Sequence, residues 1–371
     1  MEQTSIKTAI SSVSEKESLQ LALLKFISCI AVIYIHAYTP QNSAFAAALD
    51  KLPVFHYIAE TLSKYMAQVA VPVFFMVSGY IYFSKQYTQK WHIFALNKAR
   101  SILFPYLLWN TLAIAYIFAA QIPESVRNIF PANKVIANFS AADWIYAYMG
   151  WDSGWYPFLY PLWFLPCLFT VFILVHTFRN CFYKYDWPIW CLTAVNIAAF
   201  AYVPLYQYLT DWGLFSRTLY SLSFFAAGKF LFKYRNILTN NLFLFISLVI
   251  FAASTAMGLK KCPSYINWLI IALYPGLLAV FIIAGKVVEK FKKIQKPLLF
   301  LSGFSFLIYL THEFALTAVL STAYPRLPLN FGSFLIFFIC LPLLLAAMLI
   351  CGGWILKKVL PKVYVFLFGA R

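Results

Sequence analysis

The chain has 371 residues, of which 63% are hydrophobic and only 11% are charged, and its mean hydropathy is +0.75. So few charged residues exclude an ordinary soluble globular protein. The formal net charge of +17 calls for no nucleic-acid partner, because most of it follows from membrane topology. These values predict an all-α polytopic integral membrane protein in contact with membrane lipid.

Charge-poor runs of about 20 residues, long enough to cross a bilayer, recur along the chain. We expect about ten transmembrane helices, at residues 19–38, 65–84, 101–120, 157–178, 187–207, 213–232, 238–259, 265–285, 298–322 and 332–356. The run at 213–232 is interrupted by Arg217 and Lys229, which we expect to snorkel from near the helix ends. A single transmembrane domain at 19–358 would lie between a polar tail at 1–18 and a short tail at 359–371.

The distribution of basic residues predicts an orientation. With the amino terminus in the cytoplasm, twenty of the 29 Lys and Arg residues fall on the cytoplasmic side and eight on the outer side, while Lys25 lies within the membrane. Because cytoplasmic loops carry an excess of Lys and Arg, both termini are expected in the cytoplasm.

The first expected helix contains two ionisable side chains, Lys25 and His36. Eleven residues of an α-helix make about three full turns, so both side chains project from one face, about 16.5 Å apart. Ionisable groups inside a membrane are costly and are functional candidates for that reason. A snorkelling lysine and a packing histidine are the ordinary alternatives.

A second histidine lies in the stretch SFLIYLTHE, in the ninth expected helix. Ser305, Tyr309 and His312 share one helical face there by their spacing, with Glu313 beside them. Counted from the expected cytoplasmic edge of each helix, His36 and His312 lie at similar depths, at about 25 Å and about 22 Å of rise. Two histidines at matching depth favour a functional site over packing.

Six stretches together resemble the membrane-bound acyltransferase family 3. They are Lys25-x10-His36, VPVFFMVSGYIYF at 71–83, KARSILFPYLLW at 98–109, PLWFLPCL at 161–168, FFAAGKFLF at 224–232 and LSGFSFLIYLTHEF at 301–314. They occur in the family's order and span nearly the whole chain. The family's usual Arg-x10-His appears here with Lys25 in place of the arginine, which keeps the charge but loses the planar fork.

This resemblance implies a bacterial inner-membrane enzyme that passes an acyl group, expected to be acetyl, from cytoplasmic acyl-CoA to a sugar of a surface polysaccharide or lipid-linked glycan. Acyl-CoA would be the co-substrate, and no metal is expected. Acyl transfer to a hydroxyl needs a base with a near-neutral pKa, which His36 is suited to provide. The further candidates are His312 and Lys25 as catalytic groups; Lys98, Arg100 and Lys25 for acyl-CoA; and Trp163, Tyr309, Glu313 and Arg217 for the acceptor.

Other readings of the sequence remain open at this point. Buried charges also line the translocation paths of transporters and flippases, so a carrier of a polysaccharide precursor or a small polar substrate is the main alternative. A third is the membrane part of a resistance or racemase-like system, since one fold serves several functions. Most aromatic residues of the outer loop at 121–160 are expected at the membrane interface, with Trp163 nearer the acceptor.

Overall fold

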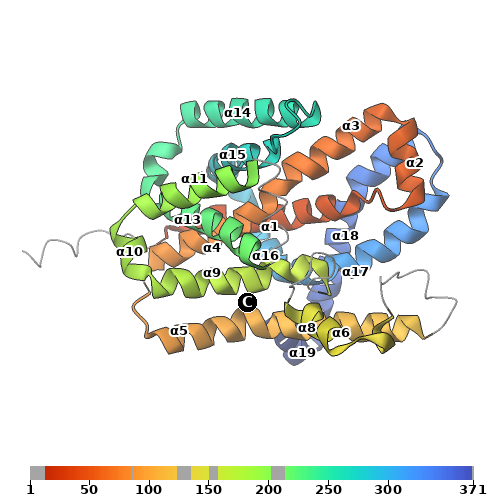
Figure 1. Ribbon diagram of the computed structural model, residues 1–371, viewed down its shortest axis with the longest axis horizontal. Helices are drawn as coiled ribbons and strands as arrows, with labels where there is room; N and C mark the ends of the chain where they lie inside the picture. The colour runs from red at the N-terminus through yellow and green to blue at the C-terminus, as the bar shows by residue number, and fades with distance from the viewer. Residues whose placement is uncertain (1–12, 86, 123–134, 150–157, 202–213, 370–371) are drawn as a thin grey trace, which may run out of the picture.

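The structure is a computed structural model that describes residues 13–85, 87–122, 135–149, 158–201 and 214–369 (Figure 1). Within these residues every regular element is helical, which confirms the expected all-α class. Eight helical runs are long and apolar enough to cross a membrane. They are Glu15–Ala37, Pro53–Lys85, Trp91–Gln121, Tyr160–Thr177, Asn241–Leu259, Trp268–Lys290, Ser305–Arg326 and Phe331–Val359.

The α-helices within these runs are numbered as in Figure 1. They are α1 Glu15–Ala37, α3 Pro53–Thr61, α4 Ala70–Lys85, α5 Trp91–Lys98, α6 Phe104–Gln121, α9 Phe164–Thr177, α14 Asn241–Leu259, α15 Trp268–Lys290, α17 Ser305–Ala323 and α18 Phe331–Val359. The others are α2 Ser43–Lys51, α8 Ala141–Met149, α10 Arg179–Lys184, α11 Trp187–Ala201, α13 Leu214–Leu238, α16 Gln295–Ser302 and α19 Pro361–Phe368. The helix α19 lies in the expected tail and packs on α6, where Trp109 Nε1 donates to the Leu367 carbonyl at 2.9 Å.

Two of the ten expected spans are not among the eight candidate spans in the described residues. The run at 187–207 contains α11, an apolar helix of 15 residues, and its remainder lies outside the described part of the chain. The run at 213–232 contains α13, which continues to Leu238 through further basic residues. Eight candidate spans thus lie in the described residues where ten were expected, because α13 carries several charged residues and because only part of the run at 187–207 is described.

Several helix boundaries also differ from those expected. The expected helix at 101–120 begins at Trp91 and passes through a π-helical segment, Ala99–Leu103, so Lys98 and Arg100 lie inside a helical run and not before it. The expected helix at 298–322 is divided by a break at Gly303 and Phe304 into α16 and α17. Hydropathy does not register such breaks, because the residues around them are as apolar as the helices.

Helices α4 and α13 pack closely through two glycines. A Cβ atom on Gly79 would lie 1.9 Å from the Phe225 carbonyl oxygen, and one on Gly228 would lie 2.3 Å from the Met76 carbonyl oxygen. Small residues allow this approach, which gives van der Waals contact where lipid supplies no hydrophobic driving force. The two glycines thus hold α4 against α13.

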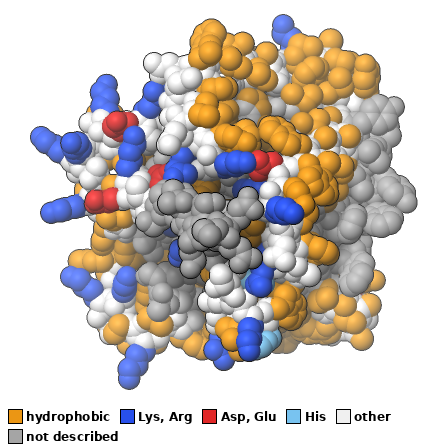
Figure 2. Space-filling model, turned by 90° about the vertical axis from the view of Figure 1, so that its left-hand side faces the viewer, with side chains coloured by type: hydrophobic (Ala, Val, Ile, Leu, Met, Phe, Trp, Pro, Cys, Tyr) orange, Lys and Arg blue, Asp and Glu red, His pale blue; other side chains and the backbone are white. Residues whose placement is uncertain are grey.

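Basic side chains gather at one end of the molecule, where α10 and the start of α5 lie (Figures 1 and 2). Ion pairs join the helices at this end: Lys16 Nζ lies 2.7 Å from Glu289 Oε2, and Arg235 Nε lies 2.6 Å from Glu17 Oε1. Tyr80 also donates to Glu17, at 2.7 Å. These contacts tie the beginning of α1 to α15, α13 and α4.

Lys229 is buried and paired, in contrast to the snorkelling side chain expected from the sequence. It is 7% exposed, and its ammonium donates to the Tyr185 carbonyl at 2.7 Å and to Asp186 Oδ1 at 2.8 Å. Burial works to raise the pKa of Asp186, but its hydrogen bonds to Lys229 and Lys233 outweigh burial, and its pKa lies below the usual value. A lysine so held costs less to bury than a lone charge.

Candidate active site

Helices α1 and α17 bring the two membrane histidines together. His36 is the penultimate residue of α1 and His312 lies in the middle of α17, and their ring centroids are 5.3 Å apart. Glu313 Oε2 lies 3.2 Å from His36 Nδ1, although these two atoms do not form a hydrogen bond of regular geometry. Three residues that the sequence singled out for separate roles thus form one cluster.

The tautomer of His312 follows from its surroundings. Its Nδ1 lies 2.8 Å from the Tyr309 carbonyl oxygen and 3.0 Å from the Ile308 carbonyl oxygen. Because carbonyl oxygens only accept, the hydrogen of the neutral ring is assigned to Nδ1, which leaves a lone pair on Nε2. His312 is 1% exposed, and its Nε2 is buried with no hydrogen-bond partner in the part of the chain that the structure describes. A buried acceptor of this kind can take a hydrogen bond from a bound hydroxyl.

Within the described residues, the cluster of His36, His312 and Glu313 is also the one group that could hold a metal ion. Two histidines and a glutamate form a zinc donor set known from metalloenzymes. The donor atoms lie within 4.8 Å of one another, and His36 Nδ1 is 3.2 Å from Glu313 Oε2, a spacing close to the roughly 3.4 Å between ligands about 2.1 Å from a tetrahedral zinc ion. The three residues could therefore hold a metal ion, although acyl transfer by a histidine base needs none.

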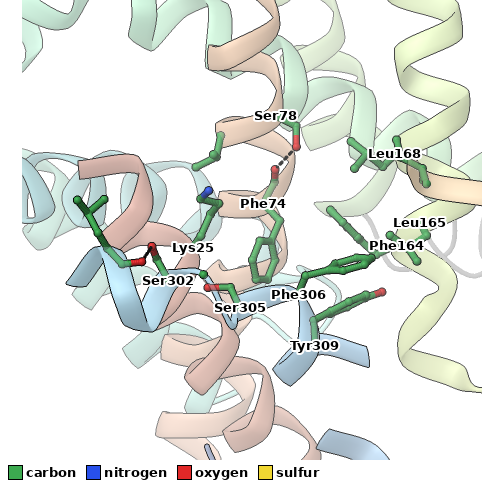
Figure 3. Close-up of a pocket in the computed structure, with 14 residues that line it drawn as sticks. Lys25, Phe74, Ser78, Phe164, Leu165, Leu168, Ser302, Ser305, Phe306 and Tyr309 are labelled. Carbon is green, nitrogen blue, oxygen red and sulfur yellow. Dashed lines mark hydrogen bonds between the residues drawn. The ribbon is translucent and has the colours of Figure 1, made fainter. Parts of the chain in front are cut away.

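A cavity of about 310 Å³ lies next to Lys25; we call it the donor-side cavity (Figure 3). Figure 3 shows Lys25 on one side and the rings of Phe164, Phe306 and Tyr309 gathered on the other. The remaining lining residues come from α4, η3 (Ala99–Leu103), α9, α16 and α17. The cavity is mainly apolar with a lysine at its side, which suits a long, narrow ligand that carries a few polar groups.

A second cavity, of about 260 Å³, is lined by both Trp163 and Arg217; we call it the outer cavity, because the orientation expected from the sequence puts Arg217 toward the outer side. The guanidinium carbon of Arg217 lies 5.6 Å from the centroid of the Trp163 ring, a cation–π contact. Its other polar or aromatic lining residues are Gln68, Tyr160, Phe200, Ser216, Tyr220 and Asn267. Aromatic faces combined with amide and hydroxyl groups suit a sugar ring, which has apolar faces and polar edges.

The residues of the histidine cluster are not among the lining residues of either cavity, but each cavity has a lining tyrosine whose ring lies near the cluster. On the donor side, the Tyr309 ring is 6.4 Å from the His312 ring. On the outer side, the Tyr160 ring is 6.2 Å from the His36 ring. Tyr160 and Tyr309 are therefore the residues that join the cluster to the cavities.

The sequence placed Tyr309 and Glu313 with the acceptor, but neither lines the outer cavity. Tyr309 lines the donor-side cavity, and Glu313 contacts His36. Of the residues expected to bind CoA, Lys25 lines the donor-side cavity while Lys98 and Arg100 do not. The Lys98 ammonium lies 3.7 Å from the Phe172 ring centroid, and Arg100 is exposed.

Sequence reasoning left several residues of the outer cavity without a role. Gln68 lies in the 3-10 segment Ala67–Val69 before α4, and Asn267 is the N-cap of α15, so the two are far apart in the chain. Tyr160 was grouped with the interfacial aromatic residues. The aromatic residues Trp151, Trp155 and Tyr156 of the outer loop lie outside the described residues. The one available signal was the neighbouring PLWFL stretch, which begins immediately after Tyr160.

The fold and the cluster define a polytopic membrane protein with two adjacent histidines and a glutamate close to two cavities. Residues 19–353 match the family model described as an acyltransferase domain. The chain belongs to the acyltransferase 3 family and is an acyltransferase. Searches of curated proteins and of solved structures find no match.

Proposed function

We propose that this protein is a membrane O-acyltransferase. It would take an acyl group, in the simplest case acetyl, from acyl-CoA at the cytoplasmic face of a bacterial inner membrane. It would pass the group to a sugar hydroxyl of a surface polysaccharide or lipid-linked glycan at the outer face. The main support is the His36, His312 and Glu313 cluster of an acyltransferase 3 chain, which lies next to a lining residue of each cavity.

The donor would enter at the basic end of the molecule. Lys98 and Arg100, one helical turn or less before Ile102 of the donor-side cavity, would meet the nucleotide end of CoA, whose phosphates are negative. Lys25 would meet a phosphate or the carbonyl groups of the arm farther in. The rise of about 16.5 Å from Lys25 to His36 is close to the length of an extended pantetheine arm. The arm would thus carry the thioester across much of the membrane while the nucleotide stays at the cytoplasmic mouth.

The chemical step would rely on His36 as the base. Glu313 Oε2 lies 3.2 Å from His36 Nδ1, and a small rotation of either side chain would let Nδ1 donate to the carboxylate, which would keep the Nε2 lone pair free for the acceptor. His36 would remove the proton from the acceptor hydroxyl as the oxygen attacks the thioester carbonyl. The carbon–sulfur bond then breaks, and the CoA thiolate takes up a proton from the imidazolium. Glu313 would stabilise that imidazolium.

His312 would act as a positioning residue. Its Nε2 has no partner among the described residues and would accept a hydrogen bond from the acceptor hydroxyl, holding the oxygen beside His36. Trp163 and Arg217 would bind the rest of the sugar in the outer cavity. The acyltransferase domain favours acyl transfer over the transporter or flippase alternative.

The test uses purified full-length protein with radiolabelled acetyl-CoA and total surface glycan from cells that lack the protein. The wild type should label the glycan. His36→Ala should remain folded, and its labelling rate should be lower by a factor of about 100 or more. Near-normal labelling by a well-folded His36→Ala protein would remove His36 from the mechanism. A wild-type protein that labels no glycan with any short acyl-CoA would contradict the proposed function.

A further inference from the structure

Tyr309 lines the donor-side cavity and lies next to the histidine cluster, with its ring centroid 6.4 Å from that of His312. Its ring lines the cavity and packs near Phe164 and Phe74, with ring centroids 5.8 and 6.4 Å away. The residue is 8% exposed, and its hydroxyl donates to the Pro161 carbonyl at 2.5 Å. A thioester in the donor-side cavity would thus meet the Tyr309 ring before it could reach His312 or His36.

The partner of that hydrogen bond belongs to a segment shared by both cavities. Pro161 lies in η5, a 3-10 turn at Tyr160–Trp163 that continues directly into α9. Tyr160 and Trp163 line the outer cavity, whereas the next residue, Phe164, lines the donor-side cavity. A short 3-10 turn has poorer hydrogen-bond geometry than an α-helix and shifts more easily. A ligand in the outer cavity that moves this turn would therefore also move Pro161, the hydrogen-bond partner of Tyr309.

Two residues of the cluster keep part of their surface exposed. The side chains of His36 and Glu313 keep 17% and 31% of their surface exposed, whereas His312 keeps almost none. Because His36 is partly exposed, a thioester that reached it without an acceptor would be open to attack by water. Such hydrolysis breaks the carbon–sulfur bond, joins the acyl carbon to the water oxygen and leaves the thiol of CoA protonated. An acyltransferase of this design needs a barrier on the donor side.

We propose that Tyr309, held by the Pro161 carbonyl, is the specificity-determining residue that keeps the donor thioester from His36 until an acceptor occupies the outer cavity. The inference rests on the proposed function. A sugar that stacks on Trp163 and displaces Tyr160 moves η5, and the Tyr309–Pro161 hydrogen bond is released. The acceptor drives this change because it binds the displaced turn better than the resting one. Tyr309 thereby selects transfer to a sugar over transfer to water.

The experiment compares CoA thiol release with glycan acylation in purified full-length protein, using acetyl-CoA and the glycan extract described above. Tyr309→Phe removes the hydroxyl and keeps the ring. The ratio of hydrolysis to transfer should rise about tenfold, the factor expected for the loss of one buried hydrogen bond. Tyr34→Phe is the matched control, because it removes a similar bond of 2.6 Å, to the Ile339 carbonyl on the α18 side of α1. The control should leave the ratio unchanged.

A second measurement needs no variant. In the wild type, thiol release without glycan should stay below about a tenth of the release with glycan, for the same energetic reason. Equal release with and without glycan would overturn the inference, as would an unchanged ratio in a folded Tyr309→Phe protein that still acylates glycan. Adding His36→Ala to Tyr309→Phe should abolish the hydrolysis, since both reactions use one base. Failure of the wild type to acylate glycan at all would instead contradict the proposed function.

Discussion

His36 at the end of α1 and Glu313 in α17 lie 3.2 Å apart, measured from Nδ1 to Oε2, although 277 positions separate them in the sequence. A carboxylate at one nitrogen of an imidazole determines which nitrogen carries the hydrogen and stabilises the ring once it takes up a proton. The first prediction follows from this pair.

Glu313→Gln keeps the size of the side chain and removes its charge. We expect the protein to fold and its acyl-transfer rate to fall about 100-fold, because the imidazolium of His36 loses its counter-charge. Glu60→Gln is the control. Glu60 lies outside the cluster, and its Oε1 is 3.0 Å from Lys64 Nζ. Rates measured at saturating acetyl-CoA decide the matter. A Glu313→Gln enzyme as fast as the control would show that the carboxylate does not assist His36.

Lys25→Arg and Lys25→Ala test the donor-side cavity. If the lysine supplies a positive charge to a phosphate or carbonyl of the donor, arginine should retain most of the activity. Alanine should raise KM for acetyl-CoA about tenfold or more, as expected when a charge-assisted contact to the donor is lost. Lys16→Ala, which breaks the ion pair with Glu289 at the basic end, is the control. Loss with arginine as severe as with alanine would mean that the compact ammonium itself is required.

Gly79→Ala should destabilise the protein by about 1–3 kcal/mol, the usual cost of overpacking. The added Cβ would lie 1.9 Å from the Phe225 carbonyl oxygen, so α4 and α13 must move apart. Gly352→Ala is a matched control, because nothing lies within 4 Å of the Cβ it adds. Thermal unfolding in detergent should show a lower midpoint for Gly79→Ala alone. Equal midpoints for the two variants would show that α4 and α13 do not pack this closely in the purified protein.

The expected membrane orientation has its own test. Single cysteines introduced near Lys90 and Lys293 should react with a membrane-impermeant reagent only from the cytoplasmic side, and cysteines near Lys51 and Arg326 only from the outer side. A variant lacking the seven native cysteines is the background for labelling. Residues 293 and 326 reacting from the same side would contradict the topology, because α17 lies between them.

Composition and helix geometry predict much of the fold and part of the site. Runs of apolar residues predict the membrane helices, and the rise of an α-helix predicts that His36 and His312 lie at similar depth, in keeping with rings 5.3 Å apart. Contacts between distant segments have no such periodic signal. The hydrogen bond from Tyr309 to Pro161, the pairing of Lys229 with Asp186 and the break before α17 all depend on tertiary packing.

The most direct test of the account is a structure of the protein with a non-hydrolysable thioether analogue of acetyl-CoA. We predict the nucleotide at the basic end near Lys98 and Arg100, the arm running past Lys25, and the sulfur in the donor-side cavity against the Tyr309 ring. A glycan fragment added to the same complex should bring the acyl carbon next to His36. A nucleotide bound in the outer cavity, or an arm that ends far from Tyr309, would contradict the account.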